Sequence, residues 1–65
     1  MNKTIQLINR KNENKLANIV KGKCRTIVYE HFDGGSKVHI KGIKLIDWIK
    51  IYPDIINLEL KDIRG

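Results

Sequence analysis

One cysteine, Cys24, and two histidines, His31 and His39, are the residues of this sequence most able to bind a metal or act as nucleophiles. A structural zinc site needs about four such ligands at short and regular spacings, and these three residues do not form that pattern. If residues 25–32 and 37–41 pair as a hairpin, the two histidines point to opposite faces. The sequence therefore predicts no metal site, and no cofactor is expected.

Catalysis by Cys24 would need a base that generates the thiolate, which is the reactive form of the thiol. Lys23 and Arg25 could favour the thiolate, but no histidine lies close in the sequence. Asp47 and Asp54 are interpreted as surface charges on a helix and a loop rather than as an acid–base pair. We therefore expect no catalytic residue and predict that the protein is not an enzyme.

The net charge of +6 is distributed unevenly along the chain. Residues 1–25 carry seven Lys or Arg side chains against one Glu, whereas the remaining residues carry six positive and six negative side chains. An excess of positive charge in one part of a chain predicts an anionic partner for that part. The alternative is that these lysines only keep the surface soluble.

An aromatic side chain adds to this pattern. Phe32 is expected on the outer face of the hairpin with Lys37, His39 and Lys41, where an aromatic ring can stack on a base while cations hold phosphates. The alternative is that Phe32 packs beneath the N-terminal segment. The candidate residues for binding nucleic acid, or a nucleotide, are Arg10, Lys11, Lys15, Lys21, Lys23, Arg25, Phe32, Lys37, His39 and Lys41.

Residues 4–9 are predicted to form a first strand. The β-branched and aromatic residues of 25–32 predict a second strand, and the alternation of apolar and polar residues in 37–41 predicts a third, with a two-residue turn within 33–36. In that hairpin one face is predicted to be the core face, with Ile27, Tyr29, His31, Val38 and Ile40. The other face carries Val28, Glu30, Phe32, Lys37, His39 and Lys41. Residues 15–21 could be a strand or a short helix capped by Asn12 or Asn14. The strand is favoured because the segment is short for an isolated helix.

The C-terminal part changes to a helical period. Residues 44–52 are predicted to form a helix whose core-facing stripe is Leu45, Trp48, Ile49 and Tyr52. Pro53 is predicted to end that helix, and the alternation of Ile56, Leu58 and Leu60 predicts a final strand.

The predicted fold is α+β, with a mostly antiparallel sheet of about four or five strands and one helix, about residues 44–52, on one face. The alternative is a small SH3-like β-barrel. Residues 1–65 are expected to form a single domain. So short a chain buries only ~60% of its unfolded surface and has no possible internal disulfide, so we expect a homodimer. No segment is long and apolar enough for a membrane span or a signal peptide, so a cytoplasmic location is expected.

The chain also shows a partial resemblance to a known family. The order Lys41-Gly42-Ile43, Leu45, Asp47-Trp48, Tyr52 and Ile55-Ile56-Asn57-Leu58-Glu59-Leu60 resembles the C-terminal half of small dimeric phage inhibitors of uracil-DNA glycosylase. Those inhibitors are acidic and this chain is basic, so their function is not carried over. The resemblance, with a composition rich in Ile, Lys and Asn, leaves one alternative function: a phage or mobile-element regulator that binds and inhibits a host protein.

Overall fold

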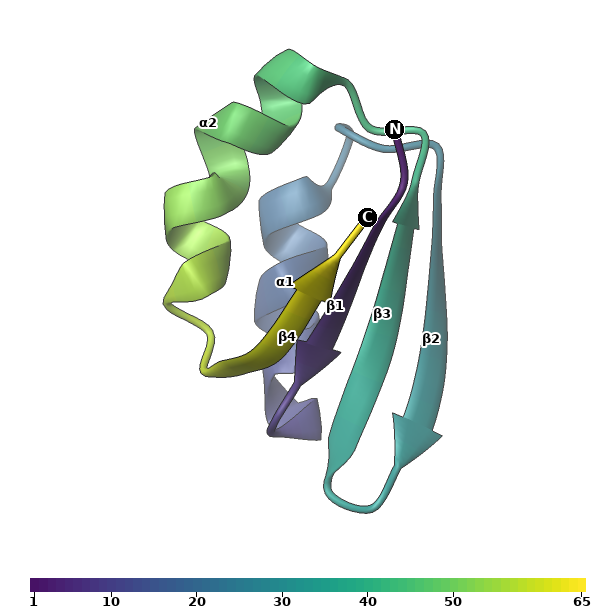
Figure 1. Cartoon of the computed structure of the whole chain (residues 1–65), viewed down its shortest axis with the longest axis vertical. Helices are drawn as coiled ribbons and strands as arrows, with labels where there is room; N and C mark the ends of the chain where they lie inside the picture. The colour runs from purple at the N-terminus through teal and green to yellow at the C-terminus, as the bar shows by residue number, and fades with distance from the viewer.

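The computed structural model describes all 65 residues as one four-stranded sheet with two helices on one of its faces (Figure 1). The element order is β1 (Lys3–Leu7), α1 (Glu13–Val20), β2 (Thr26–Phe32), β3 (Gly35–Lys41), α2 (Leu45–Ile56) and β4 (Leu60–Arg64). A short 3-10 turn, η1 (Arg10–Asn12), leads into α1. All neighbouring strands are antiparallel, in the spatial order β2-β3-β1-β4. This is the split β-α-β, or ferredoxin-like, arrangement.

The predicted α+β class is confirmed, and the alternative of a closed SH3-like barrel is wrong. The sheet stays open because β2 and β4 form its two edges. The apolar core lies between the sheet and the helices, and its members come from β1, β3, the two helices and the loops on either side of α2. The core residues are Ile5, Leu7, Leu16, Val20, Val38, Ile40, Ile43, Trp48, Ile51, Ile55 and Leu58. Neither helix has the length and apolar character needed to cross a lipid bilayer.

The predicted hairpin is confirmed together with its two faces. Phe32 pairs with Gly35, so Asp33 and Gly34 form the two-residue turn, and Gly34 adopts the positive φ of 75° that such turns require. The outward face carries the residues predicted for it. The inward residues of β2 are only partly covered because β2 is an edge strand, and Tyr29 stays 39% exposed.

Residues 15–21 belong to a helix and its C-terminal turn, so the favoured strand is wrong, and so is the prediction of a single helix. Leu16 and Val20, one turn apart, are both fully buried. A helix this short is marginal in isolation, and tertiary packing of its apolar side stabilises it instead. Gly22, at a φ of 74°, turns the chain toward β2.

The second helix continues through Pro53 to Ile56, so the prediction that Pro53 ends it is wrong. Pro53 cannot donate a hydrogen bond to the carbonyl of Ile49, and an interior proline costs roughly 3 kcal/mol. Ile51 and Ile55 are buried on either side of it, at 3% and 0% exposure. Burying each of them stabilises the fold by ~1.5–3 kcal/mol, which offsets the cost of the proline.

The predicted core-facing stripe of this helix is wrong at three of its four positions. Trp48 is buried as expected, but Leu45, Ile49 and Tyr52 are 59%, 58% and 42% exposed. The helix has two apolar stripes, and Trp48, Ile51 and Ile55 form the one that faces the core. Periodicity alone does not say which of two apolar stripes faces inward.

The final strand lies at Leu60–Arg64, so the predicted strand at residues 56–60 is displaced. Ile56 ends α2, and Leu58 is buried in the turn that follows. Glu59 reverses the chain there with a φ of 59°. The strand then pairs with β1, placing Ile63 opposite Ile5.

The corrected orientation of α2 yields a stability prediction. Ile55→Ala removes a fully buried side chain and is expected to cost ~2–5 kcal/mol in free energy of unfolding. In dilute solution, Ile49→Ala on the same helix is expected to cost below ~0.5 kcal/mol, because its side chain is mostly exposed. Urea denaturation of both variants measures the difference. Equal losses would show that α2 is rotated relative to this structure.

Candidate nucleic-acid interface

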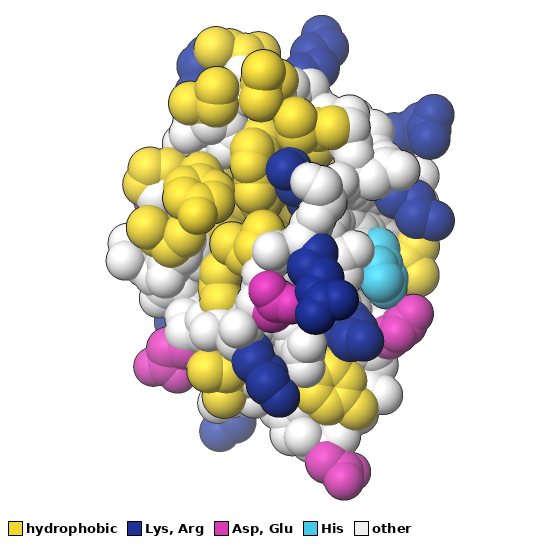
Figure 2. Space-filling view, in the orientation of Figure 1, with side chains coloured by type: hydrophobic (Ala, Val, Ile, Leu, Met, Phe, Trp, Pro, Cys, Tyr) yellow, Lys and Arg dark blue, Asp and Glu magenta, His cyan; other side chains and the backbone are white.

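The face of the sheet opposite the helices is uncovered and polar. Side chains of both charges and a histidine lie over it, next to a hydrophobic area over α2 (Figure 2). A shallow hollow of about 300 Å³ occupies the centre of this open face, and none of its lining residues is hydrophobic. The lining consists of Thr4, Gln6, Glu30, Lys37, His39, Asp62 and Arg64.

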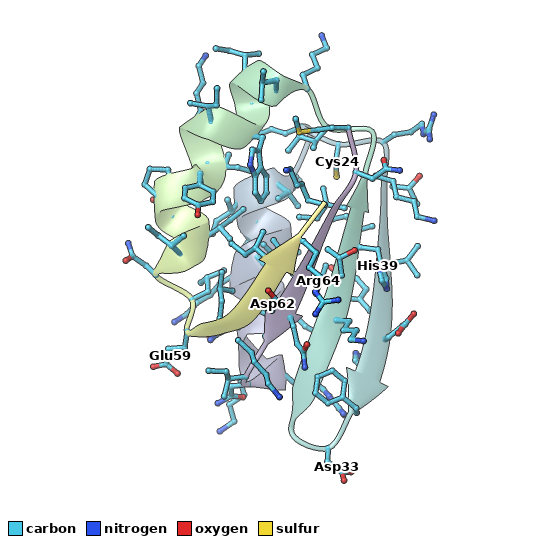
Figure 3. The ribbon with its side chains drawn as sticks, in the orientation of Figure 1. Cys24, Asp33, His39, Glu59, Asp62 and Arg64 are labelled. Carbon is cyan, nitrogen blue, oxygen red and sulfur yellow. The ribbon has the colours of Figure 1, made fainter.

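Strand register sets these side chains in two rows across the open face. In one row, Lys37 lies between Glu30 and Gln6, and Asp62 follows on β4. In the neighbouring row, His39 lies between Val28 and Thr4, and Arg64 follows on β4. Figure 3 shows Asp62, Arg64 and His39 grouped over the sheet. The site therefore depends on all four strands being in register.

Phe32 lies at the end of the open face nearest the β2–β3 turn and is 39% exposed. Gly35 is directly opposite, and a Cβ at that position would come within 2.9 Å of a ring carbon of Phe32 and 2.6 Å of the carbonyl oxygen of Leu7. Only glycine lets the ring lie so close to the strand. A second shallow hollow reaches Phe32 and shares Gln6, Glu30 and Lys37 with the first. Together the hollows lead from Arg64 to the Phe32 ring.

Most of the cations of this protein have no ion-pair partner. The ion pairs are Arg64 with Asp62 at 2.6 Å, His39 with Glu30 at 3.1 Å, and His31 with Glu13 at 2.7 Å. Every lysine is therefore outside an ion pair, including Lys37, although Glu30 lies opposite it in the register. Lysines without partners are available to anions from solution.

His39 has a fixed place in the middle of the open face. Its Nε2 lies 3.1 Å from a carboxylate oxygen of Glu30, and its Nδ1 lies 3.0 Å from Oγ1 of Thr4. An ionised carboxylate can only accept, so Nε2 donates to Glu30. Both ring nitrogens have a partner within the protein, so His39 has no free donor for a ligand. Its role is to hold the surface between Lys37 and Lys41 in place.

The structure separates the ten predicted binding residues into groups. Phe32, Lys37, His39 and Lys41 share the open face, as their alternation in the hairpin predicts. Lys15 lies on α1, in the helix layer on the opposite face of the sheet. The basic N-terminal part is therefore not one continuous surface.

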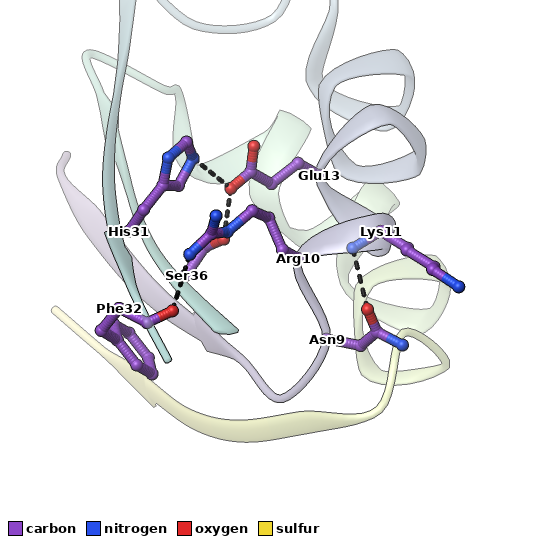
Figure 4. Close-up of polar contacts among 7 residues, drawn as sticks. All are labelled: Asn9, Arg10, Lys11, Glu13, His31, Phe32 and Ser36. Atoms are coloured by element: carbon purple, nitrogen blue, oxygen red, sulfur yellow. Dashed lines mark hydrogen bonds and ion pairs between the residues drawn. The ribbon is translucent and has the colours of Figure 1, made fainter. Parts of the chain in front are cut away.

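The remaining predicted cations lie in the segments directly before and after α1. Arg10 and Lys11 lie in η1, and Nη2 of Arg10 donates to the carbonyl oxygen of Phe32 at 2.7 Å (Figure 4). Lys21, Lys23 and Arg25 lie in the connection from α1 to β2. The backbone N–H of Arg25 donates to the carbonyl oxygen of Lys41 at 2.9 Å, so Arg25 adjoins the end of the face away from Phe32.

Thr4, Gln6, Asp62 and Arg64 are open-face residues that the sequence prediction omits. For Thr4 and Gln6 a signal exists, because they alternate with the buried Ile5 and Leu7 in β1. For the two β4 residues the displaced final strand hides the signal. Asp62 and Arg64 form an ion pair with each other, so the negative charge of Asp62 on the open face has a positive partner.

A second polar cluster lies on the helix side of the sheet. The carboxylate of Glu13 contacts Nε2 of His31 and accepts a hydrogen bond from the hydroxyl of Ser36, which is fully buried (Figure 4). A nucleophilic serine needs a base to take its proton, with a third group that orients the base. Here the carboxylate contacts both other groups and the serine does not contact the histidine. The cluster therefore ties the start of α1 to β2 and β3.

No three His, Cys, Asp or Glu side chains come together as a metal site. Burial raises the pKa of the Cys24 thiol, which is the opposite of what an activated nucleophile needs. Burial also raises the pKa of Tyr29, with smaller contributions from the charges of Glu13 and Cys24.

The chain matches no protein-family model, no curated protein and no solved structure. The partial resemblance to inhibitors of uracil-DNA glycosylase therefore has no support from these comparisons. Any functional argument rests on the geometry of the chain itself, and the fold alone does not identify a function.

The cluster around Glu13 yields a stability prediction. Glu13→Ala leaves the buried Ser36 hydroxyl without its acceptor and is expected to cost ~1–3 kcal/mol in free energy of unfolding. Chemical denaturation of the single variants and of the double variant Glu13→Ala/Ser36→Ala measures the coupling. The double variant is expected to lose less than the sum of the two single losses. Strict additivity would contradict an energetic link between the two residues.

The raised pKa of Cys24 yields a pH prediction. The folded protein holds less thiolate than a free cysteine at the same pH, so its reaction with a thiol reagent is expected to be slow at neutral pH. The rate should still be rising above pH ~8.5, the ordinary pKa of cysteine. The denatured chain provides the reference rate. A folded protein that reacts faster than the denatured chain at neutral pH would indicate an activated thiol.

Proposed function

We propose that this protein is a non-catalytic module that binds single-stranded nucleic acid across the open face of its sheet. One observation carries the proposal: a partly exposed aromatic ring, Phe32, shares that face with Lys37 and Lys41, neither of which has an ion-pair partner. Stacking a base on an aromatic ring and holding its phosphates with cations is the general chemistry of single-strand binding.

The spacing of the two lysines supports an extended ligand. Lys37 and Lys41 lie four residues apart on β3, which corresponds to ~13 Å along an extended strand. That distance allows each ammonium to contact a different phosphate of one extended nucleic-acid strand. Thr4 and Gln6 add uncharged polar groups between β3 and β4, where base edges could form hydrogen bonds.

The shape of the surface favours a single strand over a duplex. The major groove of DNA admits a helix or a two-stranded ribbon, whereas this face is a four-stranded sheet with shallow hollows. Open four-stranded sheets with exposed aromatic residues stack unpaired bases in one class of RNA-binding module. That comparison is an analogy of architecture only, because the same fold supports unrelated functions.

The acidic residues of the face bear on the strength of this binding. Glu30 and Asp62 would repel phosphate, but Asp62 is paired with the guanidinium of Arg64, and a carboxylate oxygen of Glu30 is hydrogen-bonded to His39. A free nucleotide could use the same stack on Phe32 with a single lysine. The other function raised by the sequence, inhibition of a host protein, would need an apolar contact surface, and the large one in this molecule lies on α2.

The test is a fluorescence anisotropy titration with single-stranded DNA and RNA at several salt concentrations. Lys37→Gln/Lys41→Gln is expected to weaken binding and to lower the slope of log K against log salt by ~0.7 per lost phosphate contact. Phe32→Ala is expected to cost ~1–3 kcal/mol in binding single strands and little with duplex, because duplex bases are not free to stack.

The matched control is Lys15→Gln/Lys44→Gln, which removes the same charge from the helix side of the molecule. It is expected to leave the salt slope unchanged. If both double variants weaken binding equally, the net charge and not the open face is responsible. If the wild-type protein binds neither DNA nor RNA at low salt, the proposed function is wrong.

A further inference from the structure

The second helix carries an apolar stripe that no other part of the chain covers. Leu45, Ile49, Tyr52 and Ile56 are 59%, 58%, 42% and 50% exposed. In Figure 2 hydrophobic side chains gather over α2. With Trp48, Ile51 and Ile55 facing the core, α2 is apolar on two sides, and a helix with two apolar sides is expected to be covered on both.

The spacing of this stripe is that of a helix–helix seam. Its members are separated by four, three and four residues, which is the spacing of the apolar positions of coiled coils. The order of these separations is the same when it is read from either end of the helix, and the midpoint of the stripe lies between Lys50 and Ile51. An antiparallel second copy would therefore place Leu45 opposite Ile56 of the other chain, and Ile49 opposite Tyr52.

The borders of the stripe fit such a pairing. At about 100° per residue, Ile46 and Pro53 flank the stripe on one side, and Ile46 is itself 56% exposed. On the other side Trp48 packs edge-on against Tyr52, with ring centroids 5.6 Å apart. The charged residues of the helix, Asp47, Lys50 and Asp54, point away from the stripe, so pairing would bury none of the charges of α2. The ammonium of Lys3 lies 5.2 Å from the ring centroid of Trp48, at the border of the stripe.

The exposed area is close to what a specific interface needs. An apolar patch of five half-exposed large side chains reaches the roughly 300–600 Å² of the largest patches on monomers, which are often functional. Two such patches with their polar borders bury on the order of 1,000–1,200 Å², the lower limit for a specific interface. An interface of this size would form reversibly and would depend on the protein concentration.

We propose that α2 pairs with α2 of a second copy of this chain, antiparallel and about a two-fold axis through the Leu45–Ile49–Tyr52–Ile56 stripe. The chain carries +6 overall, but the charges on and next to α2 cancel, with Lys44 and Lys50 against Asp47 and Asp54. A second copy is therefore not repelled at the seam itself. The open face adjoins the hydrophobic area over α2 (Figure 2), but no residue of the stripe lines its hollows, so the pairing uses other side chains than the proposed nucleic-acid site.

Sedimentation velocity of the full chain from micromolar to submillimolar concentration tests the proposal. The wild type is expected to pass from monomer to dimer over that range. Ile49→Glu is expected to raise the dissociation constant at least ~30-fold, the effect of losing a central contact of an interface. Circular dichroism of the dilute variant should show an intact fold, because the side chain of Ile49 is exposed in the monomer.

The matched control is Ile8→Glu, which changes an isoleucine of nearly the same exposure, 56%, outside α2. It is expected to dimerise like the wild type. A wild type that stays monomeric throughout, or an Ile49→Glu variant that dimerises as well as Ile8→Glu, overturns the proposal. Higher salt should strengthen the dimer by screening the net charge, the opposite of its effect on nucleic-acid binding.

Cross-linking tests the orientation of the two helices. In a Cys24→Ser background, a Leu45→Cys chain mixed with an Ile56→Cys chain should form mixed disulfides, because the two positions face each other. Leu45→Cys alone should not, because its two copies are offset by ~16 Å along an antiparallel pair, beyond the ~7 Å limit between Cα atoms. Efficient cross-linking of Leu45→Cys to itself would instead indicate a parallel pair and overturn the two-fold arrangement.

Discussion

The insertion of β1 between β3 and β4 is the interaction on which the rest of this structure depends. Ile5 in that strand is fully buried and pairs with Val38 on one side and Ile63 on the other. The first and last strands of the chain meet there. In addition, the terminal ammonium of Met1 donates to the carbonyl oxygen of Ile43 at 2.8 Å, which ties the start of the chain to the segment after β3. Both faces of the sheet need this strand. Its apolar residues complete the core, and Thr4 and Gln6 complete the open face.

The small size of the protein explains why the other two surfaces exist. The two helices cover most of one face of the four-stranded sheet, except along the edge strand β2. The second face stays in water, and the polar residues of each strand point toward it. The two helices contribute only five residues to the core. The stripe that α2 leaves uncovered is apolar, and a small chain without disulfides gains stability when a second molecule covers such a surface.

Features that depend on local chemistry could be predicted from the sequence. The hairpin has its turn residues and its alternation in one segment, so its faces and the grouping of Phe32, Lys37, His39 and Lys41 follow directly. The type of segment 15–21 depends on what Leu16 and Val20 contact, which no local pattern reveals. Pro53 misleads because tertiary burial of Ile55 outweighs a local helix-breaking signal. The contributions of β1 and β4 to the open face arise from pairing between the ends of the chain.

The two proposed surfaces also complement each other energetically. One stacked base gives ~1–3 kcal/mol, whereas micromolar affinity needs about 8 kcal/mol. A single copy with one aromatic ring and two lysines on its open face would therefore bind a single strand weakly. Pairing through α2 would join two open faces, and the second contact would then form at a high effective concentration, which can raise the overall affinity by ~10²–10⁴-fold without any new contact. The apolar stripe could in this way supply affinity that the open face lacks, provided that the strand is long enough to reach both faces.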